Sequence, residues 1–139
     1  MEKFDHINLE QGELIISHQN NVQRFQLFQD GIYIESRYFG DIYITNLKIL
    51  FIDRNLRTEF SMPLNSINQI VYKRRYFSTN SIEIIASGSK DKIAWKLIFD
   101  EDGASKFKNE LKKLPIHDKV SVQSPLISEI KEFSFDRGN

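Results

Sequence analysis

The chain has 139 residues, with 19 basic and 19 acidic side chains, 40% hydrophobic residues and no cysteine. This length fits one domain, the balanced charge gives no argument for nucleic-acid binding, and the lack of cysteine excludes disulfides and thiolate metal sites. No stretch reaches the roughly 18 apolar residues of a membrane-spanning helix, and the amino terminus lacks a signal-peptide core, so we expect a cytoplasmic protein.

Alternating apolar residues run through most of residues 13–99, and Gly, Asn, Asp and Ser bound the segments. Period-two alternation of this kind predicts a series of antiparallel strands. The first break is at Asn20 and Asn21, and asparagine tolerates the left-handed backbone conformation that a tight turn requires. We therefore expect a turn there, between strands near 14–18 and 22–28.

The stretch "GDIYITNLKILFIDRN" divides in the same way at Thr45 and Asn46. This predicts a second hairpin, with strands at 41–44 and 48–53. The following stretch, "TEFSMPLNSINQIVYKRR", supplies two more apolar runs. Because proline cannot donate to a strand ladder, Pro63 indicates an edge strand, a bulge or a strand end.

The clearest strand is "KIAWKLIFD", which has a distinct core face. Its partner is predicted to be "SIEIIAS", joined to it through residues 87–91 in a hairpin with a glycine available for the turn. The count is about seven strands in total. The core face consists of Ile93, Trp95, Leu97 and Phe99.

One helix is predicted after the strands, within "DEDGASKFKNELKKL". Asp100 is a suitable N-cap, acidic residues follow it at the positive end of the helix dipole, and Pro115 ends the helix. Apolar residues recur at spacings of three and four, so that one stripe can lie on the sheet. This stripe consists of Ala104, Phe107, Leu111 and Leu114.

The last part of the chain differs in character from the rest. We expect a domain over residues 1–114 and a linker or tail over 115–139, because this tail is mixed in polarity and contains two prolines. Within the tail, "LISEIKEF" places apolar residues at helical spacing and could form a short amphipathic segment.

A basic cluster stands out in the stretch "YKRRYFSTNS", residues 72–81. Lys73, Arg74 and Arg75 precede a turn, while Lys90 and Lys92 flank the next hairpin loop. If the two loops converged, five cations would face one phosphorylated headgroup, and arginine can make paired hydrogen bonds to phosphate oxygens. Consecutive hairpin loops usually point to opposite ends of a sheet, so a solvated basic strand end is the alternative interpretation.

Catalytic motifs are missing from the sequence. His6, His18 and His117 are scattered, none lies in a metal-binding spacing, and no nucleophile elbow or glycine-rich phosphate loop occurs. We therefore expect neither an enzyme nor a bound metal or cofactor.

About seven strands followed by one carboxy-terminal helix resemble a pleckstrin-homology-like domain, a bent antiparallel sandwich or partly open barrel capped by that helix. The segments "GELIISHQNNVQRFQ", "GDIYITNLKILFIDR", "MPLNSINQIVYKRR" and "AWKLIFDEDGASKFKNELKKL" are together similar to the GLUE domain of the ubiquitin-binding ESCRT-II subunit. "YITNLKILF" is also similar to a hairpin of GRAM domains.

The resemblance to a GLUE domain implies a non-catalytic adaptor on endosomal membranes that binds phosphoinositides, ubiquitin and other ESCRT subunits in cargo sorting. Lipid binding would then fall to the basic residues near the two loops, with Arg74 and Arg75 ahead of the lysines. Ubiquitin would bind along an edge near residues 107–114, by residues that no short motif identifies. The alternatives are a protein-binding pleckstrin-like domain whose basic residues hold acidic peptides, and a GRAM-like scaffold with an inert basic turn.

Overall fold

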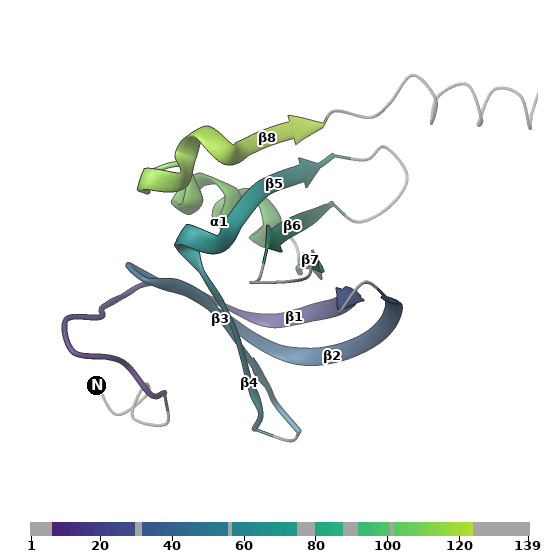
Figure 1. Ribbon diagram of the computed structural model, residues 1–139, viewed down its shortest axis with the longest axis horizontal. Helices are drawn as coiled ribbons and strands as arrows, with labels where there is room; N and C mark the ends of the chain where they lie inside the picture. Colours follow the sequence, from purple (N-terminus) through teal and green to yellow (C-terminus); the bar gives the residue numbers. More distant parts are fainter. Residues whose placement is uncertain are drawn as a thin grey trace, which may run out of the picture.

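The computed structural model describes residues 7–29, 32–55, 57–74, 80–87, 92–100 and 102–123. In this part of the chain, eight strands form one open sheet in the order β4-β3-β2-β1-β7-β6-β5-β8, and one α-helix follows β7 (Figure 1). Neighbouring strands are antiparallel except β5 and β8. The mostly β, pleckstrin-homology-like fold class predicted from the sequence is confirmed, with eight strands in place of about seven.

The first two strands are the longest, with 15 and 14 residues, and they pair with each other along most of their length. The strands are β1 (Ile15–Gln29), β2 (Ile32–Thr45), β3 (Lys48–Asp53), β4 (Glu59–Pro63), β5 (Ile67–Lys73), β6 (Ser81–Ser87), β7 (Lys92–Ile98) and β8 (Val120–Gln123). The helices are α1 (Gly103–Leu111) and the 3-10 turns η2 (Leu64–Ser66) and η3 (Pro115–Lys119).

The predicted turn at Asn20 and Asn21 is wrong, because β1 continues through it. The pairing of β1 with β2 shifts register between Gln19 and Val22, so the two asparagines form a β-bulge inside one strand. Asn21 has φ 62°, as expected of a residue in the left-handed region. Bulges and turns both use such residues, so the sequence signal was real but did not distinguish the two structures.

The hairpin predicted at Thr45 and Asn46 is confirmed. The Thr45 hydroxyl oxygen accepts hydrogen bonds from the backbone N–H groups of Leu47 (3.0 Å) and Lys48 (2.9 Å), which holds the turn. Earlier in β2, Gly40 lies so close to β3 that a Cβ built on it would stand 1.9 Å from the Ile52 carbonyl oxygen. A larger residue there would force the two strands apart.

The predicted pairing of "SIEIIAS" with "KIAWKLIFD" is confirmed as β6 and β7. Trp95, Leu97 and Phe99 are buried on the expected face, and Ile93 packs against the same core. Pro63 is the last residue of β4, which forms one edge of the sheet. This agrees with the predicted edge or strand end.

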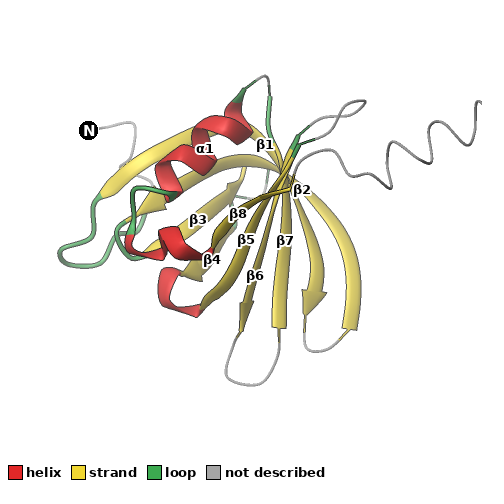
Figure 2. Cartoon of the chain, turned by 90° about the horizontal axis from the view of Figure 1, so that it is seen from above, coloured by secondary structure: helices red, strands yellow, loops and turns green. Residues whose placement is uncertain are grey.

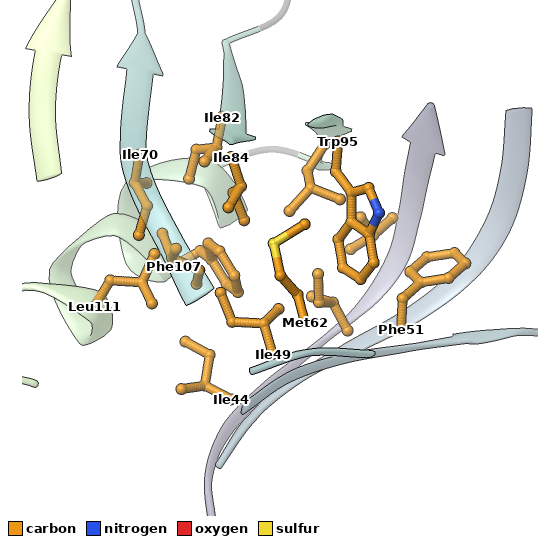
Figure 3. Close-up of a cluster of buried hydrophobic side chains, with 14 of the residues drawn as sticks. Ile44, Ile49, Phe51, Met62, Ile70, Ile82, Ile84, Trp95, Phe107 and Leu111 are labelled. Atoms are coloured by element: carbon orange, nitrogen blue, oxygen red, sulfur yellow. The ribbon is translucent and has the colours of Figure 1, made fainter. Parts of the chain in front are cut away.

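Helix α1 closes one end of the sheet interior by packing against β1, β5 and β6. Ala104, Phe107 and Leu111 are buried, and Leu114 packs against the same core from its rim. Figure 3 shows Phe107 and Leu111 near Ile70, with Trp95 farther along the interior. The expected cap differs: the helix begins at Gly103 after Asp102, whose side chain makes no capping bond, and Asp100 contributes only its carbonyl oxygen to the Gly103 N–H, at 2.8 Å.

Residues 115–123 do not form the expected linker. They form η3 and β8, which pairs in parallel with β5. Ile116 is buried in the main core, and the Lys119 ammonium donates to the Ile67 carbonyl at 2.7 Å. A four-residue strand held largely by main-chain bonds leaves too short an alternation to be recognised in the sequence. The expected amphipathic segment "LISEIKEF" lies outside the described residues.

Candidate functional site

The predicted basic cluster begins at the end of β5. The Lys73 ammonium pairs with the Glu83 carboxylate of β6 at 2.9 Å, so its charge is balanced locally. Arg74 is exposed directly after the strand. Arg75 and Lys90 lie outside the described residues. Of the predicted cations that the structure describes at this end, Arg74 is therefore the one with no ion pair.

Lys92 lies at the opposite end of the sheet. In the strand register, Lys73 faces Ser81 and Lys92 faces Ser87, which are the first and last residues of β6. Seven residues of extended chain separate these positions by roughly 20 Å. Figure 2 shows the end of β5 and the start of β7 at opposite ends of the sheet. The structure thus does not bring the described members of the cluster together.

Exposed apolar side chains lie at the end of the sheet that carries Lys92. Phe28, near the end of β1, is 42% exposed, and Ile32 and Tyr33 at the start of β2 are each 62% exposed. The Phe28 and Tyr33 rings meet edge to face, with centroids 5.5 Å apart. Because Phe28 pairs with Ala94, Lys92 lies two residues farther toward the same end. We call Phe28, Ile32, Tyr33 and Lys92 the open-end patch.

A cavity of about 440 Å³ lies inside the sheet toward this same end, away from α1. Strands β1, β2, β4 and β7 contribute its walls, so residues far apart in the sequence meet in it. The side chains most relevant to its chemistry are Arg24, Gln26, Ser36, Tyr38, Glu59, Phe60 and Trp95.

Arg24 is fully buried, with an exposed fraction of 0%. Its guanidinium carbon lies 4.0 Å from the centre of the Phe60 ring, 4.8 Å from those of Tyr38 and Trp95, and 5.5 Å from that of Phe51. Aromatic faces attract a cation, and more strongly where water is excluded. These rings therefore compensate in part for removing the arginine from water.

The hydrogen bonds of Arg24 are incomplete. Its Nη1 donates to Gln26 Oε1 at 2.6 Å, and Gln26 is itself held by donating to the Phe28 carbonyl at 2.7 Å. Nε and Nη2 are buried and have no hydrogen-bond partner in the described structure. A buried donor without a partner costs about 1 to 3 kcal/mol. Burial lowers the pKa of Arg24 to about 10, although Tyr38 and Asp53 act in the opposite direction, so the guanidinium is charged at neutral pH.

Comparison with protein families matches the GRAM domain over residues 2–114. The chain belongs to the GRAM domain family. Domains of this family are commonly lipid- or protein-binding modules. No curated protein sequence matches this GRAM domain significantly.

Solved structures share its fold at low sequence identity. The hSac2 domain from the human phosphoinositide phosphatase Sac2 is 9% identical, with a TM-score of 0.54 over 91% of this chain and 86% of that one. A chain of the 8S snRNP assembly intermediate is 10% identical, with a TM-score of 0.53 over 71% of this chain and 80% of that one. These likenesses support the pleckstrin-homology-like fold of the GRAM domain.

The described parts of the GRAM domain give no support for a metal site, a membrane-spanning helix or an exposed ubiquitin-binding stripe on α1. These parts contain no group of three or more His, Asp or Glu side chains that could hold a metal ion. None of their helices is long and apolar enough to cross a membrane. The stretch considered for ubiquitin contains Phe107 and Leu111, which are buried in the core and leave Leu114 half-buried beside them.

Sequence reasoning missed Arg24. In "VQRFQLF" the inward positions of β1 are Val22, Arg24 and Gln26, whereas Phe25 and Leu27 lie half-buried on the outer face. The period-two signal was visible, but apolarity alone assigns the core to Phe25 and Leu27. A polar pair alternating with apolar residues beside a bulge is the signal that could have revealed an inward-facing arginine.

Proposed function

We propose that this GRAM domain is a non-catalytic module that docks on anionic, phosphoinositide-containing membranes through the open-end patch. The observation that carries the proposal is the 62% exposure of both Ile32 and Tyr33 beside Phe28 and Lys92. Apolar and aromatic groups of this kind enter the interface between headgroups and acyl chains, and a neighbouring cation favours anionic lipid.

Docking of this kind would be weak and reversible. One lysine near an anionic surface contributes about 1 kcal/mol, and a few partly exposed apolar side chains add only the burial of their remaining surface. A phosphoinositide headgroup carries more charge than other anionic lipids. We therefore expect binding to depend on it and to fall as salt screens the exposed charges over about 8 Å at physiological ionic strength.

Vesicle sedimentation tests this proposal, with phosphatidylcholine alone, with added phosphatidylserine, and with each phosphoinositide in turn. The double variant Ile32→Ser with Tyr33→Ser should lose most of the bound fraction while its unfolding curve stays nearly unchanged. Leu14→Ser removes an apolar side chain that is 69% exposed elsewhere, and should bind as wild type does. Equal binding of the double variant and wild type would exclude the open-end patch as the docking surface.

The basic cluster predicted from the sequence is tested by further variants in the same sedimentation experiment. Lys73, Arg74 and Arg75 remain candidate lipid-binding residues. Of these, Lys73 ends β5 and Arg74 follows it directly, at the other end of the sheet from Lys92. Changing both arginines to Glu tests that end, and Lys92→Glu tests the open end. If only the arginine variant lost binding, the membrane would face the end of β5 instead. If wild type bound no phosphoinositide vesicle, membrane docking itself would be excluded.

The narrower resemblance to a GLUE domain extends the proposal to ubiquitin, to ESCRT-II subunits and to endosomal membranes in cargo sorting. Its support is the segment similarity described above. Titrating ¹⁵N-labelled protein with ubiquitin measures this directly, because contact residues would shift in the amide spectrum. Unchanged spectra at millimolar ubiquitin would remove this extension and leave the membrane proposal standing.

A further inference from the structure

We infer that the cavity at the open end binds a small amphipathic carboxylate, whose two oxygens pair with the Nε and Nη2 donors of Arg24. This site lies inside the sheet and is separate from the membrane surface proposed above. It rests on a fully buried arginine, an enclosing set of aromatic rings, two donors without partners and a cavity that the same arginine lines.

The unpartnered donors are the right pair for a carboxylate. In a guanidinium group, the Nε–H bond and one Nη2–H bond are parallel and spaced to bind both oxygens of one carboxylate. The third nitrogen of Arg24, Nη1, is already engaged by Gln26. The aromatic rings attract the positive charge but offer no lone pair to the N–H groups. A bound carboxylate would supply the two hydrogen-bond acceptors that the surrounding side chains do not provide.

The charges of the cavity favour a single negative charge. Among its described lining residues, Arg24 is the cation and Glu59 the acidic residue. A phosphate with nearly two negative charges would meet one guanidinium and one opposing carboxylate. A carboxylate needs only the one paired contact, so it fits this lining better than phosphate does.

Part of the cavity wall is apolar and would contact the body of the ligand. Ile34, Phe60, Ile93 and Trp95 line the cavity, with the hydroxyls of Ser36 and Ser61 among them. The volume of about 440 Å³ lies within the usual range of roughly 300 to 1,000 Å³ for small-molecule sites. A short alkyl or aromatic acid therefore fits both the volume and the lining.

The site is also held in place before any ligand arrives. Gln26 is fixed by its bond to the Phe28 carbonyl, and the Tyr38 and Phe60 rings contact each other with centroids 4.9 Å apart. The guanidinium lies between these groups and so has little freedom to turn away. Nε and Nη2 are themselves buried, so a carboxylate would pair with them only after a small shift of the aromatic rings that cover them.

Trp95 gives a direct measurement, since it is the only tryptophan of the chain and its ring lies 4.8 Å from the guanidinium carbon of Arg24. Hexanoate is the probe, titrated at neutral pH against tryptophan fluorescence, with hexan-1-ol and inorganic phosphate as matched ligands. We expect hexanoate to bind saturably and at least tenfold more tightly than hexan-1-ol or inorganic phosphate does. Absence of saturation with hexanoate, or equal binding of hexan-1-ol, would overturn the inference.

Variants separate the paired contact from simple apolar burial. Arg24→Met keeps most of the side-chain volume and should weaken hexanoate at least tenfold, with little effect on hexan-1-ol. Glu59→Gln should tighten hexanoate several-fold by removing the opposing charge. Arg37→Met, which changes an exposed arginine of β2, is the matched control and should leave both affinities unchanged.

Arg24→Lys is the second test at this position, since it keeps the charge but loses the paired donors. It should lower hexanoate affinity while the fold is retained. Hexanoate affinity equal to that of wild type in a folded Arg24→Lys or Arg24→Met protein would show that the guanidinium does not hold the carboxylate.

Discussion

Two buried charged side chains, Glu13 and Arg24, have very different numbers of partners. Glu13 receives the Thr45 hydroxyl at 2.5 Å and the Glu10 backbone N–H at 2.9 Å, and Lys48 lies 3.5 Å away. Arg24 has one hydrogen bond and two donors without partners. A charge that only fastened the fold would be expected to have partners as complete as those of Glu13. The incomplete set at Arg24 supports the carboxylate site inferred above.

The two ends of the sheet interior also differ in how they are filled. Toward the end that α1 closes, the interior is filled by apolar side chains such as Ile44, Ile49 and Leu111, all with 0% exposure (Figure 3). Toward the open end, the interior contains the cavity around Arg24. Packing supplies stability at the closed end, whereas the open end gives up some packing for a polar site.

The largest expected effect comes from breaking the closed end. Leu111→Ala should lower the free energy of unfolding by about 2 to 5 kcal/mol, because it removes buried methyl groups and leaves a cavity under α1. Urea denaturation measures the change, with the exposed Leu14→Ala as the control. A loss below about 0.5 kcal/mol would mean that the helix stripe is not packed as described.

Glu13 tests the satisfied charge and should have an intermediate effect. Burial raises its pKa, but the hydrogen bonds from Thr45 and Glu10 and the charge of Lys48 outweigh burial, so the net pKa lies below its ordinary value. A carboxylate with a lowered pKa stabilises the fold above its unfolded pKa and loses this contribution as pH falls through its folded pKa. Glu13→Gln should therefore cost about 1 to 3 kcal/mol at pH 7.

The same variant has a pH signature. The difference between wild type and Glu13→Gln should shrink as the pH falls below the ordinary glutamate pKa of about 4.3, and it should be smallest below the lower pKa of folded Glu13, where both side chains are uncharged. Urea denaturation at neutral and acidic pH gives both values. A difference that did not change with pH would show that the carboxylate charge contributes nothing to the fold.

Arg24 should produce the smallest effect, and in the alkaline range. Its pKa of about 10 lies well below the ordinary value of an arginine, so the folded protein loses this proton before the unfolded chain does. Stability contributed by this residue must then rise with pH across that window. From pH 9 to 11, wild type should gain about 1 kcal/mol relative to Arg24→Met in urea denaturation, because the variant lacks the titrating group. A flat difference would mean that Arg24 is not desolvated.

Local rules predicted the parts of the fold that depend on a single segment. The stripe of α1, the core face of β7 and the turn at Thr45 all followed from periodicity or turn chemistry over a few residues. The bulge at Asn21 required knowledge of the strand on the other side, because only pairing with β2 decides whether a left-handed residue ends a strand or bends it.

The candidate sites depended even more on long-range geometry. Lys73 and Lys92 are close in sequence to consecutive loops, and only the register of β6 shows that they lie at its two ends. The rings around Arg24 come from β2, β3, β4 and β7, so no window of sequence contains the cavity. The sequence held every residue of this site but no local pattern that joined them.

The short strand β8 affects how this molecule behaves among its own copies. Without it, β5 would be a seven-residue edge with unpaired backbone groups, and such an edge is a template for aggregation. Four paired residues of β8 cover it, and the Arg74 N–H donates to the Gln123 carbonyl at 2.8 Å. The other edge, β4, is short and ends in Pro63. Cleavage within 115–119 would uncover the longer edge and favour self-association of chains that are otherwise correctly folded.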